Sequence, residues 1–175
     1  MSSKTRASSP GGVTLYERHI WDLFGFSNWL AMNTTHDDMY LSPIIIPYRL
    51  TIDRLGCVIN AAAGNIRLGI YADNGDTPAG GALLAESAAT LAVVRKNELA
   101  LTIGTLRLNP GLHWLAINQD NDAMNPDGQV IDDMNQGGTL RSKFAVHVFG
   151  PLPNPCPAVA DSLHIVKYVR VLSVP

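Results

Sequence analysis

From residue 41 onward, the sequence consists largely of short runs in which apolar residues alternate with other residues. In NIRLGIY, residues 65–71, the apolar side chains of Ile66, Leu68 and Ile70 recur at every second position. A period of two places such side chains on one face of an extended strand and predicts a half-buried β-strand. About eight runs of this kind, separated by turn-forming residues and without a long helical pattern, are typical of an all-β sandwich or barrel.

Eight strands with long cross-connections favour one all-β fold, a jelly-roll-like antiparallel β-sandwich with an extended N-terminal arm. We expect two regions: an arm and aromatic-rich segment over residues 1–40, and the sandwich domain over residues 41–175. The runs range from LSPIII at residue 41 to the β-branched segment that ends the sequence.

Alternation also assigns faces within the expected strands. Between residues 50 and 59 it puts Leu50 and Ile52 on one face, and Leu55, Cys57 and Ile59 on the other. Cys57 is expected to be a small buried hydrophobe.

Two further side chains carry structural expectations. Cys156 lies in a proline-rich segment far from Cys57, and two cysteines alone leave the question of a disulfide open. Trp114 is expected in the core between the sheets, with an exposed sugar-stacking platform as the alternative.

The N-terminal region has the composition of a contact segment. Residues 1–12 lack apolar periodicity and should be disordered alone in water, and Lys4 and Arg6 give them a positive bias. They are either a solvated tail or an arm that becomes ordered on a neighbouring subunit. Aromatic side chains follow, and large aromatic residues anchor interfaces. The candidate partner-binding residues are therefore Lys4, Arg6, Trp21, Phe24 and Trp29.

The loop after NIRLGIY has oxygen ligands at near-alternate positions, Asp73, Asn74 and Asp76, which resembles the spacing of calcium loops. A calcium loop of the EF-hand type would end with a glutamate at its twelfth position, where this sequence has Leu84. Asn74-Gly75 is a strong turn signal because both residue types tolerate positive φ. We therefore favour a structural turn over a calcium site.

A second acidic stretch, residues 120–139, is expected to be a loop, with Asn125 to Gly128 forming a type I turn. Loops of this length are often functional. An interface role, a metal site and a plain solvated loop all remain open here. The candidate recognition residues are Asp120, Asp122, Asp127, Asp132 and Asp133.

Several classes of function are disfavoured. The formal net charge of -2 does not suit a nucleic-acid binder, and no apolar run approaches the ~18 residues of a membrane span. Neither a nucleophile motif nor a P-loop occurs, and the histidines are not at metal-ligand spacing. We expect a protein that is not an enzyme, uses no cofactor and binds neither nucleic acid nor membrane.

Residues 40–120 resemble a β-sandwich module of tailed-bacteriophage virion proteins. The resemblance rests on IDRLG at residue 52, on RLGIYADNGDTP at residue 67 with the Leu83-Leu84 exit, and on LNPGLHWLA at residue 108, where His113 replaces a frequent tyrosine. Such modules occur in head decorations, head fibres and tail fibres.

The resemblance implies a virion structural protein that is made in the host cytoplasm. The lack of heptads and of repeated fibre segments favours a capsid decoration, or cement, protein on the head surface over a fibre. Its expected partners are other virion proteins, above all the major capsid protein, and further copies of itself, with a trimer among the options. The alternative is a receptor- or glycan-binding module of a tail or head fibre.

Overall fold

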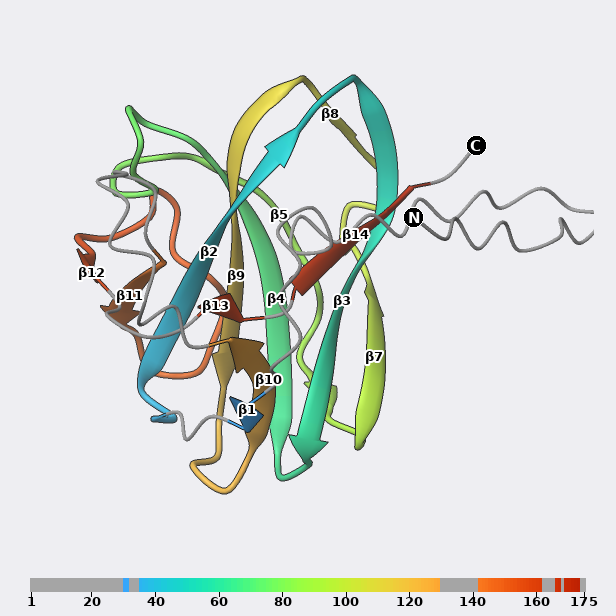
Figure 1. Ribbon diagram of the computed structural model, residues 1–175, viewed down its shortest axis with the longest axis vertical. Helices are drawn as coiled ribbons and strands as arrows, with labels where there is room; N and C mark the ends of the chain where they lie inside the picture. The colour runs from blue at the N-terminus through green and yellow to red at the C-terminus, as the bar shows by residue number, and fades with distance from the viewer. Residues whose placement is uncertain (1–29, 32–34, 130–141, 162–165, 168, 174–175) are drawn as a thin grey trace, which may run out of the picture.

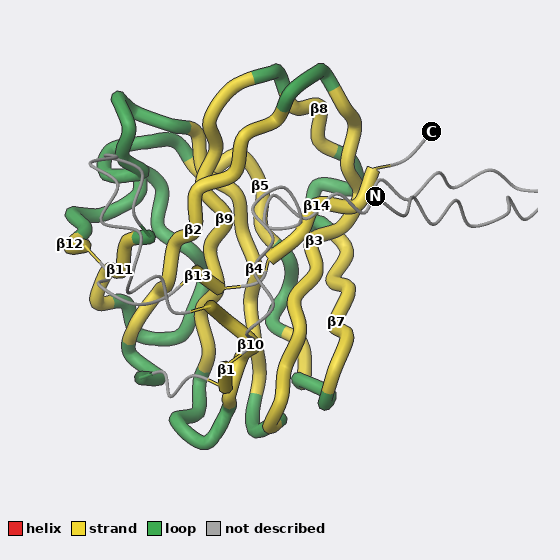
Figure 2. Tube along the Cα trace, viewed as in Figure 1, coloured by secondary structure: helices red, strands yellow, loops and turns green. Residues whose placement is uncertain are grey.

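The computed structural model describes residues 30–31, 35–129, 142–161, 166–167 and 169–173. Within these ranges every regular element is a β-strand, and no helix is present (Figure 2). Accordingly, the described residues contain no helix that is long and apolar enough to cross a membrane. The all-β prediction is confirmed.

One sheet, here called the β9 sheet, has the strand order β12-β11-β2-β9-β4-β5, with β6 beside β4 (Figure 1). All its pairings are antiparallel. In chain order its strands are β2 (Asp38–Ile46), β4 (Asn65–Ala72), β5 (Leu83–Glu86), β6 (Thr90–Leu91), β9 (Gly111–Gln119), β11 (Lys143–Val146) and β12 (Ala160–Asp161).

The other sheet, the β3 sheet, is built around its longest strand and is also antiparallel. Its strands are β1 (Leu30–Ala31), β3 (Leu50–Ala61), β7 (Arg95–Ala100), β8 (Leu106–Leu108), β10 (Asn125–Gln129), β13 (Val166–Lys167) and β14 (Val169–Ser173). The chain crosses repeatedly between the sheets, for example from β2 to β3, from β3 to β4 and from β8 to β9. This connectivity agrees with the expected jelly-roll-like β-sandwich.

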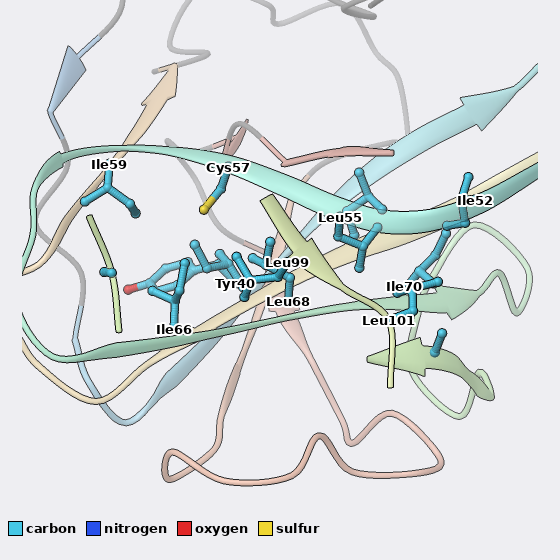
Figure 3. Packing of buried hydrophobic residues seen from close by; sticks show 14 of the residues in the cluster. Tyr40, Ile52, Leu55, Cys57, Ile59, Ile66, Leu68, Ile70, Leu99 and Leu101 are labelled. Carbon is cyan, nitrogen blue, oxygen red and sulfur yellow. The ribbon is translucent and has the colours of Figure 1, made fainter. Parts of the chain in front are cut away.

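The main core lies between the two sheets. Figure 3 shows side chains of β3, among them Leu55 and Cys57, pointing toward Ile66 and Leu68 of β4. All four are almost completely buried. Removing such aliphatic side chains from water is the dominant favourable contribution to folding a sandwich.

The prediction that Ile52 lies on the opposite face of β3 from Leu55, Cys57 and Ile59 is wrong. Ile52, Leu55 and Ile59 all belong to the main core, so the alternation slips between Ile52 and Leu55. The register of β14 against β3 shifts at the same place, where Leu172 pairs with Arg54 and the next residue pairs with Ile52. Asp53 has no partner in β14 and makes a β-bulge in β3. Because of this extra residue, the apolar side chains before and after the bulge point into the same core.

A second core covers the opposite face of the β9 sheet. Trp114 of β9 and Tyr71 of β4 alternate with main-core residues, and both point away from the β3 sheet. They pack with Leu152 and Cys156 of residues 147–159, which we call the proline-rich cap and which is orange in Figure 1. Trp114 is therefore a core residue, as expected, but it lies beneath this cap and not between the sheets.

The predicted division between residues 40 and 41 falls inside β2, whose Tyr40 belongs to the main core. Residues 1–29, which include the proposed arm, lie outside the described residues.

Candidate interaction surface

The loop between β4 and β5 is a structural turn held by Asp73. One carboxylate oxygen of Asp73 accepts a hydrogen bond from the Trp114 indole nitrogen at 2.8 Å, and the other accepts one from the Asp76 backbone at 3.1 Å. Positive φ occurs at Gly75 and Asp76, one position later than the expected Asn74-Gly75 pair. Asp73 thus fixes the buried tryptophan and its own turn.

The same loop is joined to the proline-rich cap. Backbone hydrogen bonds of 2.9 Å link Gly80 to Cys156 and Cys156 to Gly81, and the Tyr71 hydroxyl donates to the Pro153 carbonyl at 2.9 Å. Both cysteines are buried free thiols in separate cores, so no disulfide joins Cys57 and Cys156. Burial raises the pKa of the Cys156 thiol to about 12, which leaves it protonated and unreactive at neutral pH.

The second acidic stretch is only partly a loop. Residues Asn125–Gln129 form β10 and pair with β3, β1 and β13, so the predicted type I turn at Asn125 to Gly128 is wrong. The pairing partners are distant in sequence and override the local turn signal of Asn-Pro-Asp-Gly.

The five candidate recognition residues separate into three groups. Asp120 is a framework residue, because its carboxylate accepts hydrogen bonds from the backbone and side-chain nitrogens of Asn65 at 2.6 and 2.7 Å. Asp122 is exposed. Asp127 belongs to β10, its side chain is outside the described residues, and Asp132 and Asp133 lie outside them altogether.

Asp122 is part of an exposed ionic cluster that the sequence did not indicate. Its carboxylate accepts hydrogen bonds from the backbone of His36 at 2.6 Å and from the His36 ring nitrogen Nδ1 at 3.0 Å. The other ring nitrogen of His36 lies 3.1 Å from the carboxylate of Asp37. The hydrogen bond and charge of Asp122 raise the pKa of His36, and His36 in turn lowers the pKa of Asp122.

The ionic cluster lies at one end of the sandwich, the lower end in Figure 1, where β2 begins and β9 ends. Two apolar patches are exposed at the same end. The 91–94 patch consists of Leu91, Val93 and Val94, around the β6–β7 turn. The 146–148 patch consists of Val146 and Val148, where β11 ends opposite Asp38.

Sequence patterns offered only a weak signal for these patches. Val93-Val94 is embedded in an apolar stretch that resembles a strand, and Val146 and Val148 have the alternation of a strand face. Whether an apolar side chain is covered depends on where distant strands end, which local alternation does not specify.

The predicted partner-binding residues Lys4, Arg6, Trp21, Phe24 and Trp29 all lie outside the described residues. The chain enters the described sandwich at β1, which starts at Leu30 and pairs with Asp127 and Gly128 of β10. Among the residues placed by the structure, no group of three or more histidine, cysteine, aspartate or glutamate side chains could hold a metal ion.

Comparison of the sequence with family models and with curated proteins gave no match.

Proposed function

We propose that this protein is a non-enzymatic structural protein of a tailed-bacteriophage virion, and that it decorates the surface of the head. The observation that carries the proposal is the hydrogen bond between Asp73 and Trp114. It joins the two separate segments of the resemblance, YADNGDTP and LNPGLHWLA, within one buried framework. The residues that carry the resemblance therefore hold the scaffold together, which suits a structural module better than a catalytic site.

Attachment is assigned to the N-terminal segment. Trp21, Phe24 and Trp29 provide aromatic anchors for an interface, while Lys4 and Arg6 provide positive charge. Because β1 is paired in the sandwich from Leu30, the residues before it are tethered directly to the folded domain. Ordering such a segment costs conformational entropy, which aromatic burial against the major capsid protein must exceed.

The test is binding to purified heads that lack the protein. We expect removal of residues 1–12, and separately Trp21→Ala with Trp29→Ala, to reduce occupancy of the heads at a fixed protein concentration. The matched control is Tyr48→Ala, which removes an exposed aromatic side chain in the turn between β2 and β3. Unchanged occupancy for both N-terminal variants, with melting temperatures equal to the wild type, would refute attachment through this segment.

One observation favours the alternative, a receptor- or glycan-binding module. Tyr48 is 45% exposed, and beside it Arg49 donates a hydrogen bond from Nε to the Asn109 side chain at 3.3 Å. An exposed aromatic ring with polar neighbours at a loop end is the arrangement of many sugar-binding sites. Binding on a glycan array that is lost in Tyr48→Ala, with head binding intact, would favour this alternative.

A further inference from the structure

The lower end of the sandwich carries most of the exposed large apolar side chains. Of eight such residues among those described, five lie in the two patches: Leu91 (68% exposed), Val93 (54%), Val94 (57%), Val146 (76%) and Val148 (71%). Single exposed apolar residues are ordinary, but patches gathered at one end of a domain mark interaction surfaces.

The 91–94 patch is held in place by a buried asparagine. The Asn97 side chain accepts a hydrogen bond from the Val93 nitrogen at 2.9 Å and donates to the Val93 and Arg95 carbonyls at 2.8 and 3.2 Å. Arg95 has a φ of 79°, a conformation that non-glycine residues rarely adopt. Backbone strain of this kind persists only where the surrounding structure enforces it, and it is often found at binding surfaces.

The 146–148 patch is also fixed from both sides. The backbone nitrogen of His147, between the two valines, donates to the Asp37 carbonyl at 2.6 Å, and its own carbonyl accepts from the Asn118 side chain at 3.1 Å. The patch is therefore attached to the start of β2 and the end of β9, next to the ionic cluster.

The net charges beside the two patches are opposite in sign. Arg95 and Lys96 follow the 91–94 patch directly and are exposed, and Lys96 forms an ion pair with Glu98, which leaves one net positive charge. Asp37 adjoins the 146–148 patch through the His147 hydrogen bond, and Asp122 is linked to the same corner through His36, so this corner has one net negative charge when His36 is protonated. An apolar surface beside positive charge is complementary to an apolar surface beside negative charge.

The strand order places the two patches on opposite sides of one end. β11 lies near one edge of the β9 sheet, followed by β2, β9 and β4, and β6 pairs with the start of β4. A two-fold rotation that joins two copies through this end, about an axis perpendicular both to the strands and to the row that they form, makes two equivalent contacts, each between the 91–94 patch of one copy and the 146–148 patch of the other. Such self-complementarity is the condition for an isologous dimer.

We propose that a second copy of this chain docks end to end on the lower end of the sandwich. The 91–94 patch of each copy then covers the 146–148 patch of the other, with Arg95 and Lys96 near the partner copy's acidic corner. This inference concerns self-association and is independent of the proposed attachment to a head.

Sedimentation of the full chain tests the proposal. We expect a species of twice the 18.9-kDa chain mass. Val94→Asp and Val146→Asp should each raise the dimer dissociation constant about tenfold or more, since each puts a charge into an apolar contact. Ile103→Asp is the matched control because Ile103 is 56% exposed, against 57% for Val94, and lies outside both patches. A monomeric or trimeric wild type, or a dimer that neither patch variant weakens, would overturn the proposal.

A charge exchange tests the pairing of unlike patches. Arg95→Glu alone should weaken the dimer, and Arg95→Glu combined with Asp37→Lys in the same chain should restore part of the lost affinity. If the double variant binds no better than the single one, the two patches do not face each other and the proposed orientation is wrong. Thermal melting of every variant separates loss of association from loss of folding.

Discussion

At the scale of single residues, His36 is an exposed group whose charge depends on pH near neutrality. Its two ring nitrogens face the carboxylates of Asp122 and Asp37. A neutral imidazole has one N–H to donate, whereas the cation has two, so this geometry fits the protonated ring. The backbone hydrogen bond from His36 to Asp122 does not need a charged ring, but both ring contacts together need a protonated His36 and ionised carboxylates.

We therefore predict a defined pH range for this contact. The pKa of His36 is raised above 6.5, so its contribution to the free energy of unfolding is complete below pH 6.5 and is lost as pH rises through the raised pKa. The pKa of Asp122 is lowered below 3.8, so its contribution is complete above pH 3.8 and is lost as pH falls through the lowered pKa.

The measurement is an NMR titration of the His36 ring. We expect a midpoint above 6.5 in the wild type and a lower one in Asp122→Asn, which removes the charge and keeps the size of the side chain. Asp76→Asn, an exposed aspartate in another loop, is the control. A wild-type midpoint at or below 6.5, or one that Asp122→Asn leaves unchanged, would contradict the cluster.

At the scale of elements, the β4–β5 loop illustrates how a loop can be structural. A β-carbon added at Gly81 would lie 2.2 Å from the Ala72 carbonyl oxygen and 2.9 Å from that of Pro78, and backbone atoms cannot move aside as a flexible side chain can. At Gly75, nothing lies within 4 Å, and only the φ of 75° opposes an alanine.

The two glycines give a matched pair of variants. We expect Gly81→Ala to lower the free energy of unfolding by about 2–4 kcal/mol, because it displaces the loop and its hydrogen bond to Cys156. Gly75→Ala should lower it by about 1 kcal/mol, the strain of one left-handed residue. Urea denaturation measures both. If both variants lowered the free energy of unfolding by the same amount, the loop would be able to move aside at Gly81 at little cost and would not be part of the framework.

Much of the fold follows from local alternation, and the exceptions have physical causes. Ile66, Leu68 and Ile70 are buried on one face as the period of two predicts. The bulge at Asp53 reverses the alternation in mid-strand, and a bulge is set by pairing with neighbouring strands, which local sequence does not specify.

Long-range pairing accounts for the other errors. Asn125–Gln129 has the composition of a turn but completes a sheet, since β3, β1 and β13 all pair with it. Trp114 lies on the outer face of the β9 sheet and is buried there because residues 147–159 cover that face. The sequence around Trp114 does not indicate that a segment so distant in the chain packs on it.

The candidate surface was predictable only in part. An interaction role for the 120–139 stretch was one of the alternatives, and Asp122 does lie exposed at the lower end. Asp120, two positions earlier, has the same side chain, yet its carboxylate accepts hydrogen bonds from Asn65 within the framework. The residue type alone therefore does not distinguish a framework aspartate such as Asp120 from an exposed one such as Asp122.

At the scale of the whole molecule, the β9 sheet is covered on both faces by its own chain. The β3 sheet packs on one face through the main core, and the proline-rich cap packs on the other through the second core. This covering removes both faces of the β9 sheet from the candidate interaction surfaces. In our proposals, the lower end of the sandwich binds the second copy and the N-terminal segment binds the head.

The most direct test of the proposed function is to locate the protein in the particle. Gold-labelled antibody against the sandwich, applied to intact virions and viewed by electron microscopy, reports its position without any variant. We predict label spread over the head surface, with little on the tail. Label confined to the tail tip, or an absence of the protein from purified virions, would contradict a head decoration protein.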